Sequence, residues 1–332
     1  FNWMEVDLNI DHVALNRAKI DVPSNLGDPM RTAIHVDASG VTATNIGVDI
    51  VGTTDANTIT GSPQGDLISG GAGQDVIDAG DGSDIVDYSD AASTIKGGAG
   101  TDFLRIIGNK DVIIDLSEVD TSNNQIKNLD QQNGFQNASG AQVVGFEDVD
   151  ASQSSGAMTI IGKDGINMNT LGGSGSDTIT GGSGNDIIKG KKGSDVIKGG
   201  SGNDDLSGNK GSDTLYGGLG TDQLRGGLGS DTYVFPNSDL QDGVTDVIHG
   251  LQNGEKIGIS SNIHWKKINE SDVTAVPNGS NSLGDTTLDA YIQKFNNDYK
   301  LVIEKTVDGT EKAFVNLGTN RPFEPLKWTT ST

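Results

Sequence analysis

Residues 172–234 read, without a break, as GGSGSDTIT GGSGNDIIK GKKGSDVIK GGSGNDDLS GNKGSDTLY GGLGTDQLR GGLGSDTYV. Each of these seven nine-residue units has Gly at its first and fourth positions, Asp at its sixth and a large apolar residue at its eighth. So strict a repeat is the strongest fold signal in the chain. The sixth-position series is Asp177, Asp186, Asp195, Asp204, Asp213, Asp222 and Asp231, and the eighth-position series is Ile179, Ile188, Ile197, Leu206, Leu215, Leu224 and Tyr233.

The order of residue types within one unit predicts a tight loop followed by a short strand. Glycine at the first and fourth positions lets the backbone turn sharply and lets neighbouring coils approach closely. The last three positions have strand character, with the middle side chain pointing inward and its neighbours outward. Units of one loop and one strand stack into a solenoid whose interior is lined by the eighth-position residues.

Such a solenoid would also stack Asp side chains of like charge. Carboxylates on neighbouring strands would lie about 5 Å apart, and their repulsion is about 0.8 kcal/mol per pair even in bulk water. This stack of sixth-position carboxylates, the Asp ladder, therefore needs a counter-charge. Carboxylates and loop carbonyls are all oxygen ligands, and this donor set suits Ca²⁺ better than Mg²⁺.

The units resemble the G-G-x-G-x-D-x-U-x nonapeptide of the RTX (repeats-in-toxin) calcium-binding proteins. The resemblance implies an all-β fold, a parallel β-roll with two nonapeptides per turn, in which same-side Asp residues are 18 positions apart. Each ion would then sit between two neighbouring same-side loops, which gives five sites in this block. One edge would carry Asp177, Asp195, Asp213 and Asp231, and the other Asp186, Asp204 and Asp222.

Residues 52–105 form a second repeat block in a single register. Its eighth-position apolar series has no gap, but its sixth-position series departs from the family pattern at Asn57 and Ser93. Asn57 can still offer a carbonyl oxygen, whereas Ser93 weakens the site beside it, so we expect two good sites and one weak site here. The two blocks together are expected to bind about seven or eight calcium ions. The sixth-position series is Asn57, Asp66, Asp75, Asp84, Ser93 and Asp102.

The rest of the chain is expected to be strand-rich. Thr121–Gly140 is rich in Asn, Gln and Ser and predicts a surface loop, whereas Asp308-Gly309 predicts a hairpin turn. Leu288–Phe295 fits a helix or a strand equally well. We predict an N-terminal strand cap (1–51), a first repeat block (52–105), a strand-containing insert that continues the solenoid (106–171), a second repeat block (172–234) and an antiparallel C-terminal cap (235–332).

Composition excludes some classes of function. The formal net charge of the 332 residues is −23, which argues against a nucleic-acid partner and is expected of a calcium-binding apoprotein. The chain has no cysteine, and hence no disulfide framework or thiolate metal site. No apolar stretch is long enough to predict a membrane span.

Motifs for catalysis are missing from the sequence. His12, His35, His249 and His264 are scattered, without the HExxH spacing of a zinc protease. Neither a G-x-S-x-G nucleophile elbow nor a phosphate-binding loop occurs. We therefore predict no enzyme activity and no catalytic residue in this chain. The alternative is an acidic pair in the caps that acts as general acid and base.

Two functions fit these features. The first is a calcium-binding structural module of a secreted bacterial surface protein, of the surface-layer or adhesin type, that folds and becomes rigid in extracellular calcium. The alternative is the calcium-folded C-terminal module of a secreted protease, lipase or cytolysin whose active part precedes Phe1. The resemblance implies export by type I secretion and an extracellular or cell-surface location. Calcium ions are the expected partners, and self-association or a cell-surface glycan are candidate further ones.

Overall fold

The computed structural model forms two compact units, residues 1–163 with 168–178, and residues 164–167 with 179–332. Every regular element among the described residues is a β-strand. The structure describes residues 4–7, 17–21, 34–41, 47–88, 93–117, 126–130, 134–137, 142–236, 245–250, 255–259, 263–265, 287–295, 298–306 and 311–318.

The strands of the first unit alternate between two parallel sheets, so that each turn of the chain adds one strand to each sheet. Ile68 pairs with Val86, and Val86 with Leu104, which is the 18-residue register expected for two nonapeptides per turn. One sheet contains β1 (Met4–Asp7), β3 (Ile34–Asp37), β5 (Thr58–Thr60), β7 (Val76–Gly82), β9 (Thr94–Gly100) and β14 (Gln142–Val144). The other contains β2 (Arg17–Asp21), β4 (Gly47–Val51), β6 (Leu67–Ser69), β8 (Ile85–Tyr88), β10 (Phe103–Gly108), β15 (Asp148–Ser154) and β17 (Asn169–Leu171).

A hairpin interrupts the first unit where the sequence predicts a surface loop. Strands β12 (Ile126–Asp130) and β13 (Gly134–Asn137) pair antiparallel, so the loop prediction for Thr121–Gly140 is wrong over these residues. The hairpin extends a further group of strands, because β12 also pairs antiparallel with β11 (Val112–Asp115). In turn, β11 pairs parallel with β16 (Met158–Ile161).

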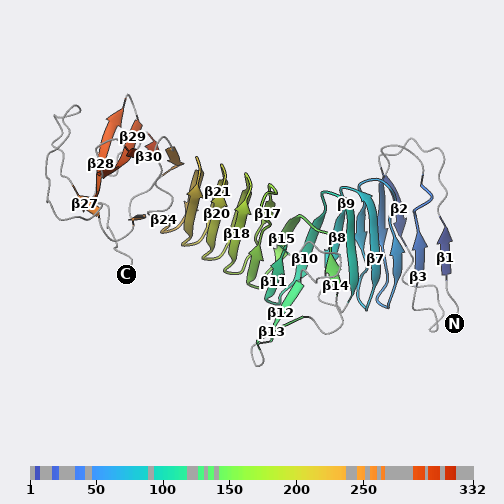
Figure 1. Cartoon of the computed structure of the whole chain (residues 1–332). Helices are drawn as coiled ribbons and strands as arrows, with labels where there is room; N and C mark the ends of the chain where they lie inside the picture. The colour runs from blue at the N-terminus through green and yellow to red at the C-terminus, as the bar shows by residue number, and fades with distance from the viewer. Residues whose placement is uncertain are drawn as a thin grey trace. The chain divides into compact units, whose positions relative to one another are not determined.

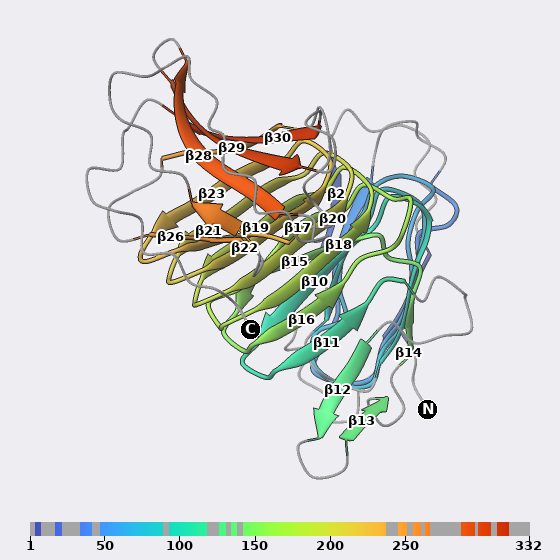
Figure 2. The same ribbon diagram turned by 60° about the vertical axis from the view of Figure 1, so that its left-hand side comes forward.

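The second unit repeats the same alternation. Ile188 pairs with Leu206, and Leu206 with Leu224, again 18 residues apart. One sheet contains β18 (Thr178–Ser183), β20 (Val196–Ser201), β22 (Thr214–Leu219), β24 (Thr232–Phe235) and β26 (Lys256–Ile259). Strands β18, β20 and β22 of this sheet can be followed in Figure 2. The other contains β19 (Ile187–Lys192), β21 (Asp205–Lys210), β23 (Gln223–Leu228) and β25 (Thr245–Ile248).

The last strands of the second unit are mostly antiparallel. Strands β28 (Thr287–Phe295), β29 (Asp298–Thr306) and β30 (Glu311–Gly318) lie side by side (Figure 1), and β29 and β30 pair antiparallel. The turn predicted at Asp308-Gly309 between them lies outside the described residues. Residues 288–295, for which the sequence left helix and strand open, are a strand. Strand β27 (Ile263–Trp265) pairs parallel with β28, and β30 pairs parallel with β25.

The eighth-position residues form the core of both units. Ile59, Ile68 and Ile77 in the first block are at most 1% exposed, and every eighth-position residue of the second block is fully buried. Tyr233 also fits this interior, because its hydroxyl oxygen accepts a hydrogen bond from the backbone N–H of Gly226 at 2.9 Å. Burying one such side chain stabilises the fold by about 2 kcal/mol. The period of nine in the sequence is thus the period of a continuous apolar interior within each block.

Candidate metal sites of the Asp ladder

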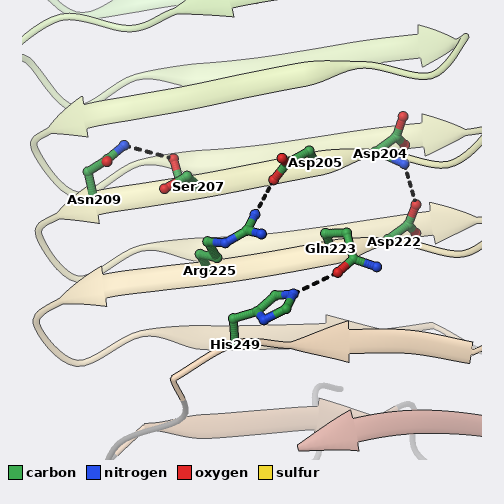
Figure 3. A network of polar contacts seen from close by, with 8 residues as sticks. All are labelled: Asp204, Asp205, Ser207, Asn209, Asp222, Gln223, Arg225 and His249. Atoms are coloured by element: carbon green, nitrogen blue, oxygen red, sulfur yellow. Dashed lines mark hydrogen bonds and ion pairs between the residues drawn. The ribbon is translucent and has the colours of Figure 1, made fainter. Parts of the chain in front are cut away.

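The sixth-position Asp residues lie where each loop enters its strand, and their side chains are buried. Within each unit, one carboxylate oxygen of an Asp accepts a hydrogen bond from the backbone N–H of the sixth-position residue 18 positions earlier. Figure 3 shows this contact between Asp204 and Asp222, at 2.9 Å. The same bond, at 2.7–2.9 Å, is accepted by Asp75, Asp84, Asp102, Asp204, Asp213 and Asp231.

The second carboxylate oxygen of several of these residues is buried without a hydrogen-bond partner among the described residues. A buried carboxylate oxygen left in this way is costly, because its hydration is lost and nothing replaces it. A cation in the loop would replace that hydration. The oxygens in question are the Oδ2 atoms of Asp84, Asp102, Asp204, Asp213 and Asp231.

Glycine at the first position of the unit keeps this oxygen accessible to an ion. A Cβ on Gly199 would stand 2.1 Å from Oδ2 of Asp204 and 2.6 Å from the carbonyl oxygen of Gly217 in the next coil. Any larger residue would therefore displace the carboxylate or the stacked carbonyl. At the second position the demand is conformational as well, because Gly200 has a φ of 121° and faces the carbonyl of Gly182.

Electrostatics in the metal-free fold favour the uncharged acids. Burial raises the pKa of Asp84 to about 8, and the neighbouring carboxylates of Asp66 and Asp102 add to the effect. Burial likewise raises the pKa of Asp204 to about 7 and that of Asp213 to about 6. Keeping these buried carboxylates ionised near neutral pH therefore lowers the stability of the metal-free fold, and a bound divalent cation would remove that loss of stability.

Asn57 presents its amide nitrogen, and not its carbonyl oxygen, to the neighbouring oxygens. Nδ2 of Asn57 donates to Oδ1 of Asp75 and to the carbonyl of Gly70, both at 2.9 Å, and to the carbonyl of Asp55 at 2.5 Å. Its Oδ1 accepts a hydrogen bond from the Thr53 hydroxyl at 3.0 Å. The prediction that Asn57 offers an oxygen to an ion would require its amide group to turn over, because its N–H donors face these acceptors here.

Two further candidate ligands have protein donors on both carboxylate oxygens. Asp66 accepts from the Ser62 hydroxyl at 2.7 Å through Oδ1 and from the Ser62 backbone N–H at 2.6 Å through Oδ2. Asp177 accepts from the backbone N–H groups of Met158 and Gly173, both at 2.8 Å. Asp66 and Asp177 are the first sixth-position aspartates of their blocks, and in each of them protein donors supply part of what an ion would supply.

Ser93 takes the place of a carboxylate in the ladder. Its hydroxyl oxygen accepts a hydrogen bond from the backbone N–H of Asp75 at 3.0 Å, so the hydrogen bond between neighbouring coils is kept without a carboxylate charge. The weak site expected beside Ser93 stays a prediction.

The ladder also includes acids that the repeat pattern missed. The backbone N–H of Asp102 donates to Oε2 of Glu147, and that of Asp222 donates to Oδ1 of Asp246, both at 2.9 Å. Strand pairing likewise puts Glu255 level with Asp231. The signal was present in the sequence, since each acid stands two positions before a buried Val149, Ile248 or Ile257, but none of the three acids follows both of the loop glycines that a repeat unit has.

The donor set fits calcium. No three His, Cys, Asp or Glu side chains gather into one metal-binding group in the described part of the chain. Each candidate site would instead combine one or two carboxylates with backbone carbonyls, and a cation that accepts such oxygens in loose geometry is Ca²⁺. Asp186, Asp195 and Asp222 lie in the same buried series and remain candidate ligands with the others.

The histidines do not gather into a site within the described residues. Exposed His249 contacts Oε1 of Gln223 through Nε2 at 2.6 Å, as Figure 3 shows. His35 lies on β3 and His264 on β27, whereas His12 falls outside the described residues.

These features define a parallel β-roll whose loops collect buried carboxylate and carbonyl oxygens. The family described as RTX calcium-binding nonapeptide repeat (4 copies) matches residues 51–86, 171–206 and 198–233. The chain therefore carries RTX calcium-binding repeats in both blocks, and these support a calcium-binding structural module. No curated protein matches the chain. In the described part of the chain, no helix has the length and apolar character needed to cross a bilayer.

Proposed function

We propose that this chain is the calcium-folded structural module of a secreted bacterial surface protein, of the surface-layer or adhesin type. The observation that carries the proposal is that Asp204 and Asp213, in the buried Asp series, have Oδ2 atoms with no hydrogen-bond partner among the described residues. A fold with this feature is costly without cations and is stabilised when they bind. No comparable arrangement of catalytic groups accompanies it in the described residues.

The mechanism is linkage between ion binding and folding. Ions that bind the folded roll and not the unfolded chain shift the equilibrium toward the roll as calcium activity rises. Extracellular calcium modules commonly bind at about 10⁻⁴–10⁻³ M. In a cytoplasm poor in calcium the charged ladder would keep the chain unfolded, a state suited to type I secretion, and the roll would form outside the cell.

The ladder sets the number of ions under this proposal. Each gap between two same-side loops holds one ion, which gives about seven or eight for the two blocks. The hydrogen bonds of Asn57 and Asp66 argue for the lower end of this range, because these residues have protein donors where an ion would lie.

Self-association would distinguish a surface-layer or adhesin subunit from a folding module attached to a secreted enzyme. We propose sedimentation velocity of the purified chain in 2 mM calcium and in chelator, at about 1 and 50 µM protein. The surface-protein proposal expects reversible association that appears only with calcium. A compact monomer at both concentrations in calcium would contradict it and favour the enzyme-module alternative. The coding sequence on either side of the chain gives an independent check, because a hydrolase motif there supports that alternative.

A further inference from the structure

The edge of the first unit that carries Asp84 and Asp102 continues beyond the nonapeptides. Strand β15 pairs parallel with β10, with Asp148 opposite Phe103 and Val149 opposite Leu104. This register puts Glu147 level with Asp102, in the place that the next sixth-position Asp takes within a repeat block. Glu147 is 45 residues from Asp102 and lies outside the residues that match the RTX family.

The turn from Gly145 to Glu147 reproduces the contacts of a repeat loop. Oε2 of Glu147 accepts the backbone N–H of Asp102 at 2.9 Å, as Asp204 accepts that of Asp186 at 2.8 Å. Glu147 is two residues after Gly145, whereas Asp204 is five residues after Gly199. The extra methylene of glutamate compensates for the shorter loop, so the carboxylate still reaches the preceding coil.

Oxygens also converge beside Gly97 as they do beside a repeat glycine. A Cβ on Gly97 would stand 2.0 Å from the carbonyl oxygen of Gly145 and 2.8 Å from Oδ2 of Asp102. At Gly199 the corresponding neighbours are Oδ2 of Asp204 at 2.1 Å and the carbonyl of Gly217 at 2.6 Å. Asp102 is fully buried, and its Oδ2 has no hydrogen-bond partner among the described residues.

We propose that Asp102, Glu147 and the Gly145 carbonyl hold a further calcium ion, at a site formed half by a nonapeptide and half by residues outside the repeats. The inference rests on the proposed calcium-binding function and extends it beyond the family-matched segments. One ion here would fix the last coil of the first block to the segment that follows the β12–β13 hairpin. It would close a long chain loop, a role that no site between consecutive nonapeptides can take.

Two neighbouring charges bear on this assignment. Asp148 is buried beside Glu147, but its Oδ1 accepts the backbone N–H of Asn169 at 2.5 Å, so that oxygen points to another coil. Lys163 is the alternative counter-charge, since its charge lowers the pKa of Glu147, although burial raises it more strongly. A test must therefore separate an ion from a lysine as the group that neutralises Glu147.

Native mass spectrometry of the full chain with calcium as the only added metal counts ions one by one. Glu147→Gln keeps an oxygen that accepts the Asp102 N–H but removes the charge, and we expect it to bind one calcium fewer than the wild type. Lys163→Gln and the exposed-site control Asp164→Asn should keep the wild-type count. Circular dichroism of each variant in calcium verifies that the fold is retained.

Failure of this site is distinguishable from failure of the proposed function. If Asp204→Asn loses an ion and folded Glu147→Gln loses none, the site between Asp102 and Glu147 is overturned while calcium binding by the repeats stands. If the wild type binds no calcium, both the site between Asp102 and Glu147 and the proposed calcium-binding function are contradicted. A crystal structure of the wild-type chain grown in calcium gives a second reading that needs no variant. Anomalous density between Asp102 and Glu147 is expected, and a filled repeat ladder with none there contradicts the proposal.

Discussion

The side-chain nitrogen of Asn57 lies 2.9 Å from Oδ1 of Asp75 and donates a hydrogen bond to it. The same nitrogen reaches the carbonyl of Gly70 in the same loop as Asp75. At the start of the first block an uncharged N–H donor thus lies beside the Asp75 carboxylate, where we propose a cation for the later coils. The chain closes this coil by its own hydrogen bonds, whereas Oδ2 of Asp84 is buried with no hydrogen-bond partner among the described residues.

Asn57→Asp should convert this coil into a cation-dependent one. The Thr53 hydroxyl could still donate to one oxygen of the new carboxylate. The other oxygen would face Asp75 and two carbonyls without a donor, so in chelator we expect unfolding to become easier by about 1–3 kcal/mol. In calcium the variant should bind one ion more than the wild type by native mass spectrometry. Asn185→Asp is the matched control, because Asn185 is exposed and uses its Oδ1 to accept the backbone N–H of Asn203. An unchanged ion count in Asn57→Asp would argue against a cation position beside Asp75.

Gly199→Ala should damage one site of the second block. Its Cβ would stand 2.1 Å from Oδ2 of Asp204, so the carboxylate or the coil must shift, at a cost of about 1–3 kcal/mol. Urea unfolding in saturating calcium measures this loss. In Gly258→Ala, the new Cβ would meet Val234 at 3.7 Å, an ordinary contact, and we expect little change. Equal losses of stability in both variants would mean that the close approach to the Asp204 carboxylate is not what requires glycine at position 199.

Lys191→Gly should stabilise the second block. Lys191 takes the second position of its unit with a φ of 79°, a left-handed conformation that costs a side-chain-bearing residue about 1 kcal/mol. Glycine fits there, and after the entropy it gains in the unfolded chain we expect a net gain of about 0.5 kcal/mol. Lys189→Gly, at an exposed strand position in the same strand, should instead destabilise by about 0.5–1 kcal/mol. Thermal unfolding in calcium compares the two variants. A lower unfolding temperature in Lys191→Gly than in the wild type would contradict the claim that the backbone of Lys191 is strained.

Acid should partly substitute for calcium. The pKa values of Asp84, Asp204 and Asp213 in the folded chain, about 8, 7 and 6, lie above the ordinary value of 3.8. The folded chain then binds more protons than the unfolded one, so its stability falls as pH rises between about 4 and 8. In chelator, lowering the pH from 8.5 to 5.5 should therefore increase the β signal in circular dichroism. A decrease over this interval would show that the buried carboxylates are not what opposes folding.

The repeat pattern was sufficient to predict the roll, because a period of nine fixes both the interior and the register. Ile188 and Leu206 pair as their spacing requires, and both are buried. The hairpin of β12 and β13 was missed, since the strands are short and rich in residues typical of loops. In such a segment tertiary pairing, here of β12 with β11, decides the conformation.

The chemistry of the ladder could be predicted only where the repeat is regular. Which atom of Asn57 faces Asp75 depends on the donors and acceptors that stacking brings together, and the sequence does not contain that information. Glu147 is level with Asp102 only because strand β15 pairs with β10 after a long excursion of the chain. Such long-range relationships follow from pairing and not from local spacing.

Far-UV circular dichroism during a calcium titration of chelated protein tests the central claim most directly, with magnesium as the control ion. The account predicts a cooperative gain of β signal near millimolar calcium that magnesium does not produce, because the loops offer carbonyl and carboxylate oxygens in loose geometry. A chain that is already fully folded in chelator at neutral pH, with a spectrum that calcium leaves unchanged, would contradict it.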